Sequence, residues 1–393
     1  MISAAILALV QSEPASRPPA ESQPSTKTIS SSKDLRLSLA AAKPGDTILV
    51  APGAYEGGIT VSNARGEAGK PIAVRAADPK NPPVFRGGNS GLHLSGAAHV
   101  ELADLCFEGA AANGINIDDA GKLDASTHHI TLKNLKVGKV GANGNEDGIK
   151  LSGVDDFRVE GCAVDRWGSA GSGIDMVGCH RGVIEGNTFT HTGAGANAIE
   201  MKGGSAEIAI RRNRFENAGA RAIQLGGSTS LQYFRPPIGG APHPEARDIT
   251  VEGNTILGSE AAIAFVGVDG AIVRFNTIHV PHKWAIRILQ ESAGPGFPPC
   301  RNGRFTDNIV VFESGKWAEG GVNVGPGTEP ASFTFARNLW YCADAPERSK
   351  PNLPSEEKGG VYGANPKFRD AATGDLRLQP DSPAKAIGAD ALR

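Results

Sequence analysis

The 393-residue sequence has few cysteines, few aromatic residues and almost no net charge. Aromatic side chains make up 6% of the chain and the formal net charge is −2, so no basic field favours nucleic acid or an anionic membrane. The five cysteines show neither CxxC pairs nor the spacing of a disulfide scaffold, and their odd number leaves at least one unpaired in a monomer. GxSxG, Walker and HExxH motifs are also missing, which leaves esterase, nucleotide-binding and zincin functions without support.

Long apolar runs are scarce as well. The segment ISAAILALV, at residues 2–10, is too short to cross a bilayer and fits the core of a signal peptide. The stretch QSEPASRPPAESQPST follows it, and this composition is typical of a disordered linker. We therefore expect residues 1–26 to be a signal-like segment with a linker, and the protein to be secreted or periplasmic without a membrane span. A buried or frayed N-terminal stretch is the alternative.

Glycine is abundant, with 51 residues, and it accompanies a repeat of two alternating elements. The second element usually opens with Gly or Ala and occurs as GINID, GIKLS, GIDMV, AIEMK, AIQLG, AIAFV, AIRIL and GVNVG. The first element reads apolar-x-apolar-x-x-Asn-x-apolar, as in VIEGNTFT and ITVEGNTI. Its Asn positions are Asn134, Asn187, Asn213, Asn254, Asn276, Asn308 and Asn338, with Cys162 in the same slot of FRVEGCAV.

Short strands, tight turns and this period predict an all-β chain that forms a right-handed parallel β-helix over residues 27–345. At a bend, stacked Asn amides can hydrogen-bond along the axis, and Asn also tolerates the left-handed conformation. The spacing of Leu35, Leu37 and Leu39 after a Ser-rich start predicts an amphipathic helix that caps the first coil. Residues 346–393 lose the repeat, and we expect them to form a closing segment.

The N-terminal third carries a closer resemblance. LAAAKPGDTILVAPGAYEGGITV and KPIAVRAADPKNPPVFRGG are similar to the opening of alginate lyases and chondroitinase B of polysaccharide lyase family six. The repeat as a whole resembles the pectate-lyase-like β-helix superfamily, and ANPKFRDAATGDLRLQPDSPAKAIGA resembles the endings of secreted bacterial β-helix proteins. The resemblance implies an enzyme that cleaves a uronic-acid polysaccharide by β-elimination.

One outward position recurs in the second element. Because neighbouring parallel strands lie about 4.8 Å apart, we expect these side chains to form a single line along one face. A salt-bridged stack without further function, as between Lys150 and Asp175, is the alternative. The line consists of Asn116, Lys150, Asp175, Glu200, Gln224, Ala264, Arg287 and Asn323.

Three insertions can begin just after strands of this face, so we expect them to rise on one edge and to wall a binding site. They lie in DDAGKLDASTHH, GGSTSLQYFRPPIGGAPHPEARD and QESAGPGFPPCRNG. Decorative surface loops are the alternative, and a lone His such as His180 or His243 is more often a structural hydrogen-bonder than a base. The expected substrate-binding residues are Lys150, Gln224, Tyr233, Arg235, His243 and Asn323.

Resemblance to family six implies a Lys base, an Arg one coil later, and acidic or amide ligands for Ca²⁺. Lys202 in IEMKGGS matches that Lys with a two-residue shift, but Gln224 or Leu225 stands where the Arg is expected. Arg287 or the loop residue Arg235 could substitute. The expected catalytic residues are Lys202, Glu200, Asp175 and Arg287; Asp175 and Glu200 are the candidate Ca²⁺ ligands, and Asp118, Asp119 and Asp147 could add others.

Two other functions stay open. Asp175 and Glu200 lie on adjacent coils, so their carboxyl groups would be about 5 Å apart, near the separation in retaining glycoside hydrolases. A non-catalytic glycan-binding or surface-structural β-helix would instead present aromatic platforms without a base, for which Tyr233, Trp284 and Trp317 are available. The expected partner is a polysaccharide in each enzymatic case, and the oligomeric state is left open.

Overall fold

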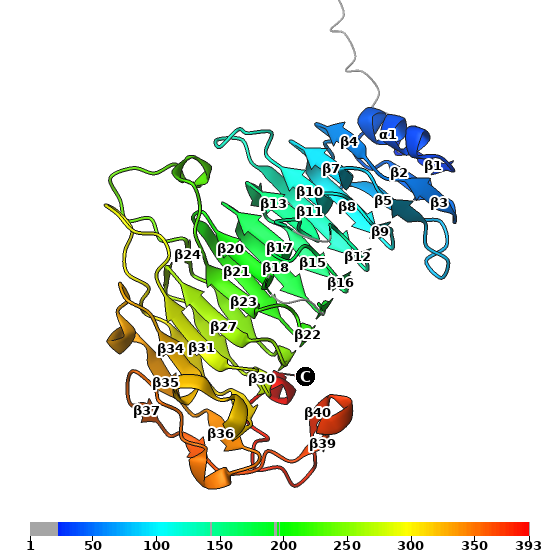
Figure 1. Cartoon of the computed structure of the whole chain (residues 1–393). Helices are drawn as coiled ribbons and strands as arrows, with labels where there is room; N and C mark the ends of the chain where they lie inside the picture. Colours follow the sequence, from blue (N-terminus) through cyan, green and yellow to red (C-terminus); the bar gives the residue numbers. More distant parts are fainter. Residues whose placement is uncertain (1–22, 142–143, 192–194, 196, 393) are drawn as a thin grey trace, which may run out of the picture.

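The computed structural model describes residues 23–141, 144–191, 195 and 197–392. The predicted signal-like run lies outside the described residues. From β1 onward the chain winds into a solenoid whose coils lie one on another and contribute short strands to three parallel sheets (Figure 1). The structure therefore confirms the predicted parallel β-helix. Among the described residues, no helix has both the length and the apolar character needed to cross a membrane.

The three sheets, here named A, B and C, follow one another around each coil. Sheet A contains β1 (Thr26–Ile29), β2 (Thr47–Val50), β5 (Ile72–Ala76), β8 (Ala98–Ala103), β11 (Thr127–Lys133), β14 (Val154–Asp155), β15 (Arg158–Glu160), β18 (His180–Glu185), β21 (Ser205–Arg211), β24 (Ala246–Arg247), β25 (Thr250–Glu252), β28 (Val268–Asp269), β29 (Ile272–Arg274), β32 (Arg304–Thr306), β35 (Thr334–Ala336) and β37 (Glu357–Lys358). Sheet B contains β3 (Ala54–Glu56), β6 (Val84–Arg86), β9 (Cys106–Glu108), β12 (Lys136–Gly138), β16 (Ala163–Asp165), β19 (Thr188–Thr190), β22 (Arg214–Glu216), β26 (Thr255–Leu257), β30 (Thr277–His279), β33 (Ile309–Phe312), β36 (Leu339–Cys342) and β38 (Val361–Tyr362). Sheet C contains β4 (Ile59–Ser62), β7 (Ser90–Ser95), β10 (Asn113–Asp118), β13 (Ile149–Ser152), β17 (Ser172–Val177), β20 (Asn197–Lys202), β23 (Arg221–Gly226), β27 (Ala261–Val266), β31 (Trp284–Leu289) and β34 (Val322–Val324).

The core is a column of stacked apolar side chains inside the coils. In β17 and β20, for example, Ile174 and Ile199 face inward and are fully buried, while the residues between the inward positions face outward. Aromatic rings stack in the same way, as Phe189 on Phe215 with ring centroids 5.0 Å apart. The five cysteines are buried in or beside this core and form no disulfides. Burial of these side chains supplies the main driving force for folding.

A ladder of buried Asn side chains runs along the turn between sheets A and B. In each step the Nδ2 of one Asn donates to the Oδ1 of the Asn one coil later, at 2.9 to 3.0 Å, and the backbone N–H donates to the same oxygen. The ladder ends on the Glu357 carboxylate, which accepts from Asn338 at 2.7 Å. Its members are Asn187, Asn213, Asn254, Asn276, Asn308 and Asn338, so the predicted stacking of amides is confirmed.

Two details of the Asn prediction are wrong. Asn134 precedes the ladder slot, which Leu135 occupies opposite Cys162, and the Asn134 side chain binds Asp104 at the surface instead. The left-handed backbone falls one residue before the ladder, as at Arg212 and Arg337, and not on the ladder Asn residues themselves. The amide is therefore selected for its hydrogen bonds, and its tolerance of positive φ plays no part.

The capping helix is α1 (Ser32–Ala41), which packs on β2 and β4 at the N-terminal end of the solenoid (Figure 1). The Ser31 hydroxyl accepts a hydrogen bond from the Asp34 N–H at 3.0 Å and so caps the first turn. Leu35 and Leu39 are buried, whereas Leu37 is 48% exposed. Residues four apart share a helix face and residues two apart do not, which explains why Leu37 lies outside the cap contact.

The C-terminal segment differs from the predicted boundary at residue 345. Strands β37 and β38 lie beyond it and add the last rungs of sheets A and B. After them, β39 (Phe368–Asp370) and β40 (Asp375–Leu378) form an antiparallel hairpin, and the chain returns along the solenoid (Figure 1). The Arg212 guanidinium donates to the Leu392 carbonyl at 3.2 Å, so the end of the chain is attached to a coil far earlier in the sequence.

Asn254→Ala should lower the free energy of unfolding by roughly 2–5 kcal/mol, because the N–H and Nδ2 of Asn213 both lose their buried acceptor. Asn134→Gly is the matched control, since it removes an exposed amide without straining a left-handed position and should cost less than about 1 kcal/mol. Denaturant titration of both variants measures the difference. Equal losses would show that the ladder contributes no special stability.

Candidate functional site

The predicted outward line of sheet C is present in the predicted register. Strand pairing places Lys150 opposite Asp175, Asp175 opposite Glu200, and Glu200 opposite Gln224. Asn116 precedes this group, and Ala264, Arg287 and Asn323 continue it toward the C-terminal end. The line exists because inward Ile and Met side chains fix which residues of each strand face outward.

Two further rows flank this line. One lies at the start of the strands and places Ser172 opposite Asn197, which is opposite Arg221; Asp147 precedes it and accepts a hydrogen bond from the Ser172 N–H at 2.7 Å. The other lies at the end of the strands and carries Lys202. Three rows of polar side chains thus meet over β13, β17, β20 and β23.

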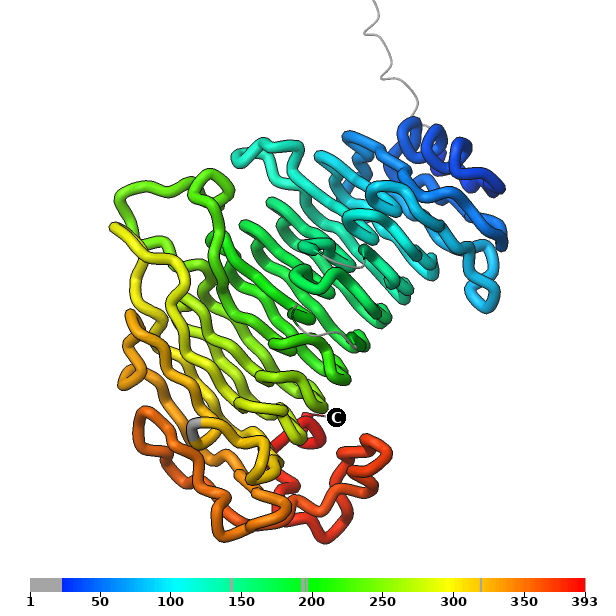
Figure 2. Tube along the Cα trace, in the orientation of Figure 1, coloured from blue at the N-terminus to red at the C-terminus, as the bar shows by residue number. Residues whose placement is uncertain are grey.

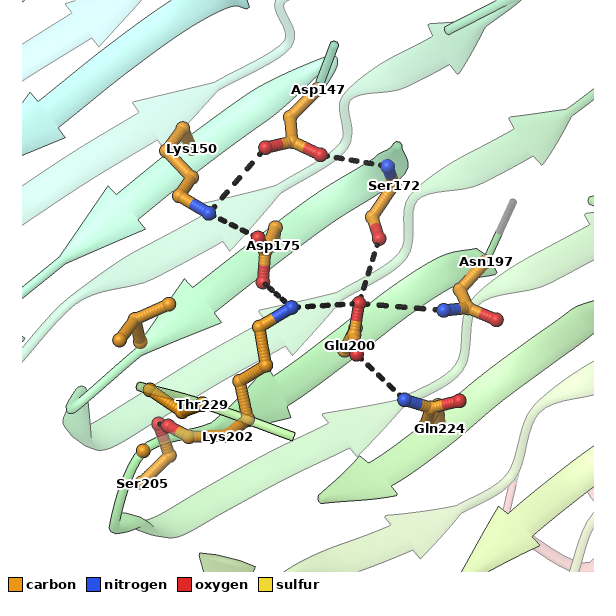
Figure 3. A network of polar contacts seen from close by, with 12 residues as sticks. Asp147, Lys150, Ser172, Asp175, Asn197, Glu200, Lys202, Ser205, Gln224 and Thr229 are labelled. Atoms are coloured by element: carbon orange, nitrogen blue, oxygen red, sulfur yellow. Dashed lines mark hydrogen bonds and ion pairs between the residues drawn. The ribbon is translucent and has the colours of Figure 1, made fainter. Parts of the chain in front are cut away.

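Carboxylates and ammonium groups alternate where these rows meet (Figure 3). The Lys150 ammonium lies 3.5 Å from the Asp147 carboxylate and donates to Asp175. The Lys202 ammonium lies 3.4 Å from the other oxygen of Asp175 and 3.1 Å from Glu200. Asp175 is therefore held between two cations, and Lys202 is held between two carboxylates.

Glu200 is the most heavily hydrogen-bonded member of the group. Its Oε2 accepts from the Ser172 hydroxyl at 3.2 Å and from the Asn197 amide at 3.3 Å, while its Oε1 accepts from the Gln224 amide at 2.6 Å. Arg221 in turn donates to the oxygen of Gln224 and so fixes which way that amide points. These bonds hold the Glu200 carboxylate in one orientation beside Lys202.

Burial perturbs the protonation of this group. Burial raises the pKa of the Asp147 carboxyl to about 7, reinforced by the nearby Asp175 carboxylate and opposed by Lys150. Burial also raises the pKa of Glu200, against the opposing effect of Lys202. For Lys202, burial alone would lower the pKa, but Asp175 and Glu200 outweigh it and the pKa is raised. In the ligand-free protein Lys202 is therefore an ammonium group at neutral pH.

A cleft of about 820 Å³ lies over this part of sheet C. Its floor contains the charged side chains of Lys150, Asp175 and Lys202, together with Ser152 and the apolar Val177. Residues 119–123 form one wall and residues 228–235 form the other, and Tyr233 is 56% exposed there. Glu200 is not among the described residues that line the cleft, because its neighbours cover it.

The three insertions rise on one edge of the solenoid, as predicted (Figure 2). The longest insertion follows β23. The pairing of β20 with β23 shifts its register between Glu200 and Met201, so that Met201 pairs with Gly226 at the end of β23. At Gly227, with φ +156°, a Cβ atom would lie 2.7 Å from the Glu200 carboxylate, so glycine lets the loop pass directly over the charged group. The buried Glu245 carboxylate accepts from the Gly203 N–H at 2.8 Å, from the Thr229 N–H at 3.1 Å and from Ser292, which joins this loop to the third.

Comparison with known proteins adds the handedness of the coil. A family model described as a right handed beta helix region matches residues 83–234, and a model described as chondroitinase B matches residues 29–131. Together with the three parallel sheets, the first match shows that the chain has a right-handed parallel β-helix fold. No curated protein matches the sequence.

Three solved structures illustrate how this β-helix compares. A polysaccharide lyase of family six from Pseudopedobacter saltans is 13% identical, with a TM-score of 0.59 over 92% of this chain and 99% of that one. Pectate lyase Pel9A is 14% identical, with a TM-score of 0.56 over 93% and 91%. The lacto-N-biosidase of glycoside hydrolase family 136 from Eubacterium ramulus is 14% identical, with a TM-score of 0.56 over 86% and 68%. At such identities these likenesses concern the fold alone.

The β-helix separates two of the predicted site residues, Arg287 and Asn323, from the charged group. Arg287 stands three coils beyond Glu200 on the outward line, about 14 Å away at the spacing of parallel strands. Its guanidinium lies 4.4 Å from the ring of Trp284 and donates to Asn323, which is one coil further still. The structure therefore does not bring Arg287 and Asn323 to the cleft floor, and Trp284 packs beside its strand.

The two loop residues are also placed away from the cleft floor. Arg235 is 8% exposed, and its guanidinium donates to both carboxylate oxygens of Asp155 at 3.1 and 2.9 Å, with His180 on the same carboxylate. His243 packs against Phe234 and Phe297 in a neighbouring hollow of about 210 Å³. Both residues hold the loop in shape, and their roles as substrate contacts stay predictions.

Sequence reasoning missed the row at the strand starts. Ser172, Asn197 and Arg221 precede the outward line by three residues in every coil, so the same register argument applied to that position would have found them. Asp147 was named only as a possible ligand. The orientation of the Gln224 amide had no signal in the sequence, because it depends on Arg221 and on Glu291, 3.2 Å from that guanidinium.

The carboxylates as arranged do not fit a calcium ion. Ca²⁺ takes about six to eight oxygen ligands, but the Lys150 and Lys202 ammonium groups stand between the carboxylates of Asp147, Asp175 and Glu200. Among the described residues, one group of three potential metal ligands from His, Cys, Asp or Glu has its ligand atoms within 4.8 Å of one another, and that group lies outside this cleft. Asp118 and Asp119 line the cleft, with Asp118 bound to His93 at 2.6 Å. The calcium requirement stays a prediction.

Asp147→Asn should change how stability depends on pH. The folded-state pKa of Asp147 is raised from 3.8 to about 7, so the folded state binds one more proton than the unfolded state between these values. Its contribution to stability is complete below pH 3.8 and is lost as the pH rises to about 7. The free energy of unfolding of the variant minus that of the wild type should therefore increase as the pH rises across this window, and it should stay constant above pH 7. Denaturant titrations at several pH values measure this, and parallel curves would contradict it.

Proposed function

We propose that this protein is a secreted enzyme that cleaves an acidic, uronic-acid-containing polysaccharide by β-elimination in the cleft over sheet C. The observation that carries the proposal is the pair of ammonium groups, Lys150 and Lys202, on the floor of a cleft that two insertions wall. An extended anionic chain needs an open groove, and each uronate carboxylate in it needs a cation with which to pair. The shared fold of a polysaccharide lyase of family six and of a pectate lyase agrees with this function.

β-Elimination needs three contributions from the site. A cation must neutralise the uronate carboxylate and so acidify the C5 proton, a base must remove that proton, and the leaving oxygen at C4 must receive one. Lys150 is the candidate for the first role, because it lines the cleft and is an ammonium group. Tyr233, exposed on the 3₁₀ turn Leu231–Tyr233, offers its ring to a sugar face.

Lys202 is the candidate base, although Asp175 and Glu200 raise its pKa and so oppose the loss of its proton. Lys202 must first lose a proton, and the Glu200 carboxylate, 3.1 Å from Nζ and with a raised pKa, is its acceptor. The neutral amine then takes the C5 proton, the C5–H electrons form the C4–C5 double bond, and the C4–O bond breaks. The new ammonium group gives its proton to the leaving oxygen, which returns Lys202 to the neutral state while Glu200 keeps the first proton.

Hydrolysis fits the geometry less well. Asp175 and Glu200 are adjacent in register, as a retaining pair requires, and a glycoside hydrolase of family 136 shares the fold. However, Ser172, Asn197 and Gln224 cover the oxygens of Glu200, so that carboxylate is not presented to the cleft. We therefore rank hydrolysis second and binding without catalysis third.

Incubation with a panel of uronic-acid polymers, with Ca²⁺ or with EDTA, separates these functions. A lyase yields products with the ultraviolet absorbance of a C4–C5 double bond, and this is the expected result. New reducing ends without that absorbance would indicate a hydrolase, and binding without either would indicate a glycan-binding protein. Loss of activity in EDTA that added Ca²⁺ restores would support the calcium prediction.

Charge-conserving variants test the assignment of the base. Lys202→Arg keeps the positive charge but cannot act as a base, so kcat should fall by about 10²-fold or more. Lys150→Arg keeps the charge that pairs the uronate, so it should retain most of kcat and change KM instead. Initial rates of both variants measure the contrast. If Lys202→Arg remains as active as Lys150→Arg, Lys202 is not the base.

A further inference from the structure

Three His side chains meet on the N-terminal half of sheet A, outside the cleft. His99 belongs to β8, and His128 and His129 belong to the next strand, β11, in which His128 pairs with Ala98. One ring nitrogen from each His lies within 4.8 Å of the other two. The rings of His99 and His129 are stacked with centroids 4.3 Å apart, and the Nδ1 atoms of His128 and His129 are 2.9 Å apart.

A bend in the coil brings the two consecutive His residues together. Successive side chains of a straight strand point to opposite faces, which would separate His128 from His129. His129 instead has φ 55°, and His99, opposite it on the previous coil, has φ 49°. Asp156, at the equivalent position one coil later, also has a left-handed backbone. The corner is therefore a feature of the fold that does not depend on a His side chain.

Three imidazoles grouped this closely are the kind of ligand that a transition metal ion prefers. The charged groups that face them are Arg65, Glu67, Asp155 and Asp156. Neutral imidazole is the form that coordinates a metal ion. A transition metal ion can bind several imidazoles at once, whereas a shared proton can form a hydrogen bond between only two of them.

We propose that His99, His128 and His129 bind one divalent transition-metal ion of the zinc type. Zn–N distances are about 2.0–2.1 Å, so three nitrogens around one ion stand about 3.3 Å apart. Rotation of the exposed His129 and the half-buried His99 and His128 adjusts the present separations, which reach at most 4.8 Å, to this value. A water molecule completes the tetrahedron.

Such an ion would tie β8 to β11 at the base of the first insertion. That insertion leaves β10 at Asp118 and re-enters β11 at Thr127, whose hydroxyl donates to the Asp118 carbonyl at 2.6 Å. Its residues 119–123 form one wall of the cleft. The ion would therefore stabilise the folded state by mass action and fix one wall, whatever reaction the cleft performs. The proposal does not rest on the proposed function.

Zinc titration of the EDTA-treated and dialysed full-length protein tests the site. Calorimetry should show one equivalent of Zn²⁺ bound, and Zn²⁺ should raise the Tm while Ca²⁺, which prefers oxygen ligands, should not occupy this site. His99→Asn and His129→Asn are suitable variants, because Asn tolerates the left-handed backbone at both positions. Each should weaken Zn²⁺ binding at least about tenfold, since loss of a group that only orients a ligand can already cost that much.

His282→Asn is the matched control, because His282 is exposed and lies outside the cluster. It should bind Zn²⁺ as the wild type does. The Tm of the metal-free His129→Asn variant reports whether that variant folds. Wild-type protein that binds no Zn²⁺, or folded His99→Asn and His129→Asn variants that bind it as tightly as the His282→Asn control, would overturn the proposal.

Discussion

The whole structure depends on one constraint, the pairing of each short strand with its counterpart one coil away. This pairing places equivalent residues in line at the spacing of parallel strands, so a single inward or outward choice is repeated along the molecule. The Asn ladder, the outward line of sheet C and the His cluster are three consequences of it. In the first two, side chains about 20 to 40 positions apart in sequence become neighbours because of register alone. In the His cluster, register brings His99 beside β11, and the left-handed corner brings His128 and His129 together.

The same constraint explains how far the sequence could predict the site. The outward line from Asn116 to Asn323 follows from the repeat and is found in the predicted pairing. The loops do not follow a repeat, so the burial of Arg235 against Asp155 had no signal in the sequence. Asn134 and Leu37 were misplaced because their patterns match only approximately: Asn134 is one residue early, and Leu37 is two residues from the buried Leu35 and Leu39.

The charged group on sheet C combines features that stability alone does not favour. Buried ion pairs seldom repay their desolvation, and here five charged side chains share one small region under an open cleft. The raised pKa values of Asp147 and Glu200 show that the arrangement holds carboxylates where ionisation is unfavourable. Asp147 and Glu200 are not among the described residues that line the cleft, but they contact Lys150 and Lys202 on its floor, and perturbed groups beside a cleft make it a candidate for a catalytic site.

A crystal structure of the Lys202→Arg variant with a uronic-acid oligosaccharide tests the central claim most directly. The account predicts that the sugar lies between residues 119–123 and 228–235, with a uronate carboxylate within about 4 Å of the Lys150 ammonium, the usual limit of an ion pair. An oligosaccharide bound on another face, or one that places only neutral groups over Lys150, would contradict it.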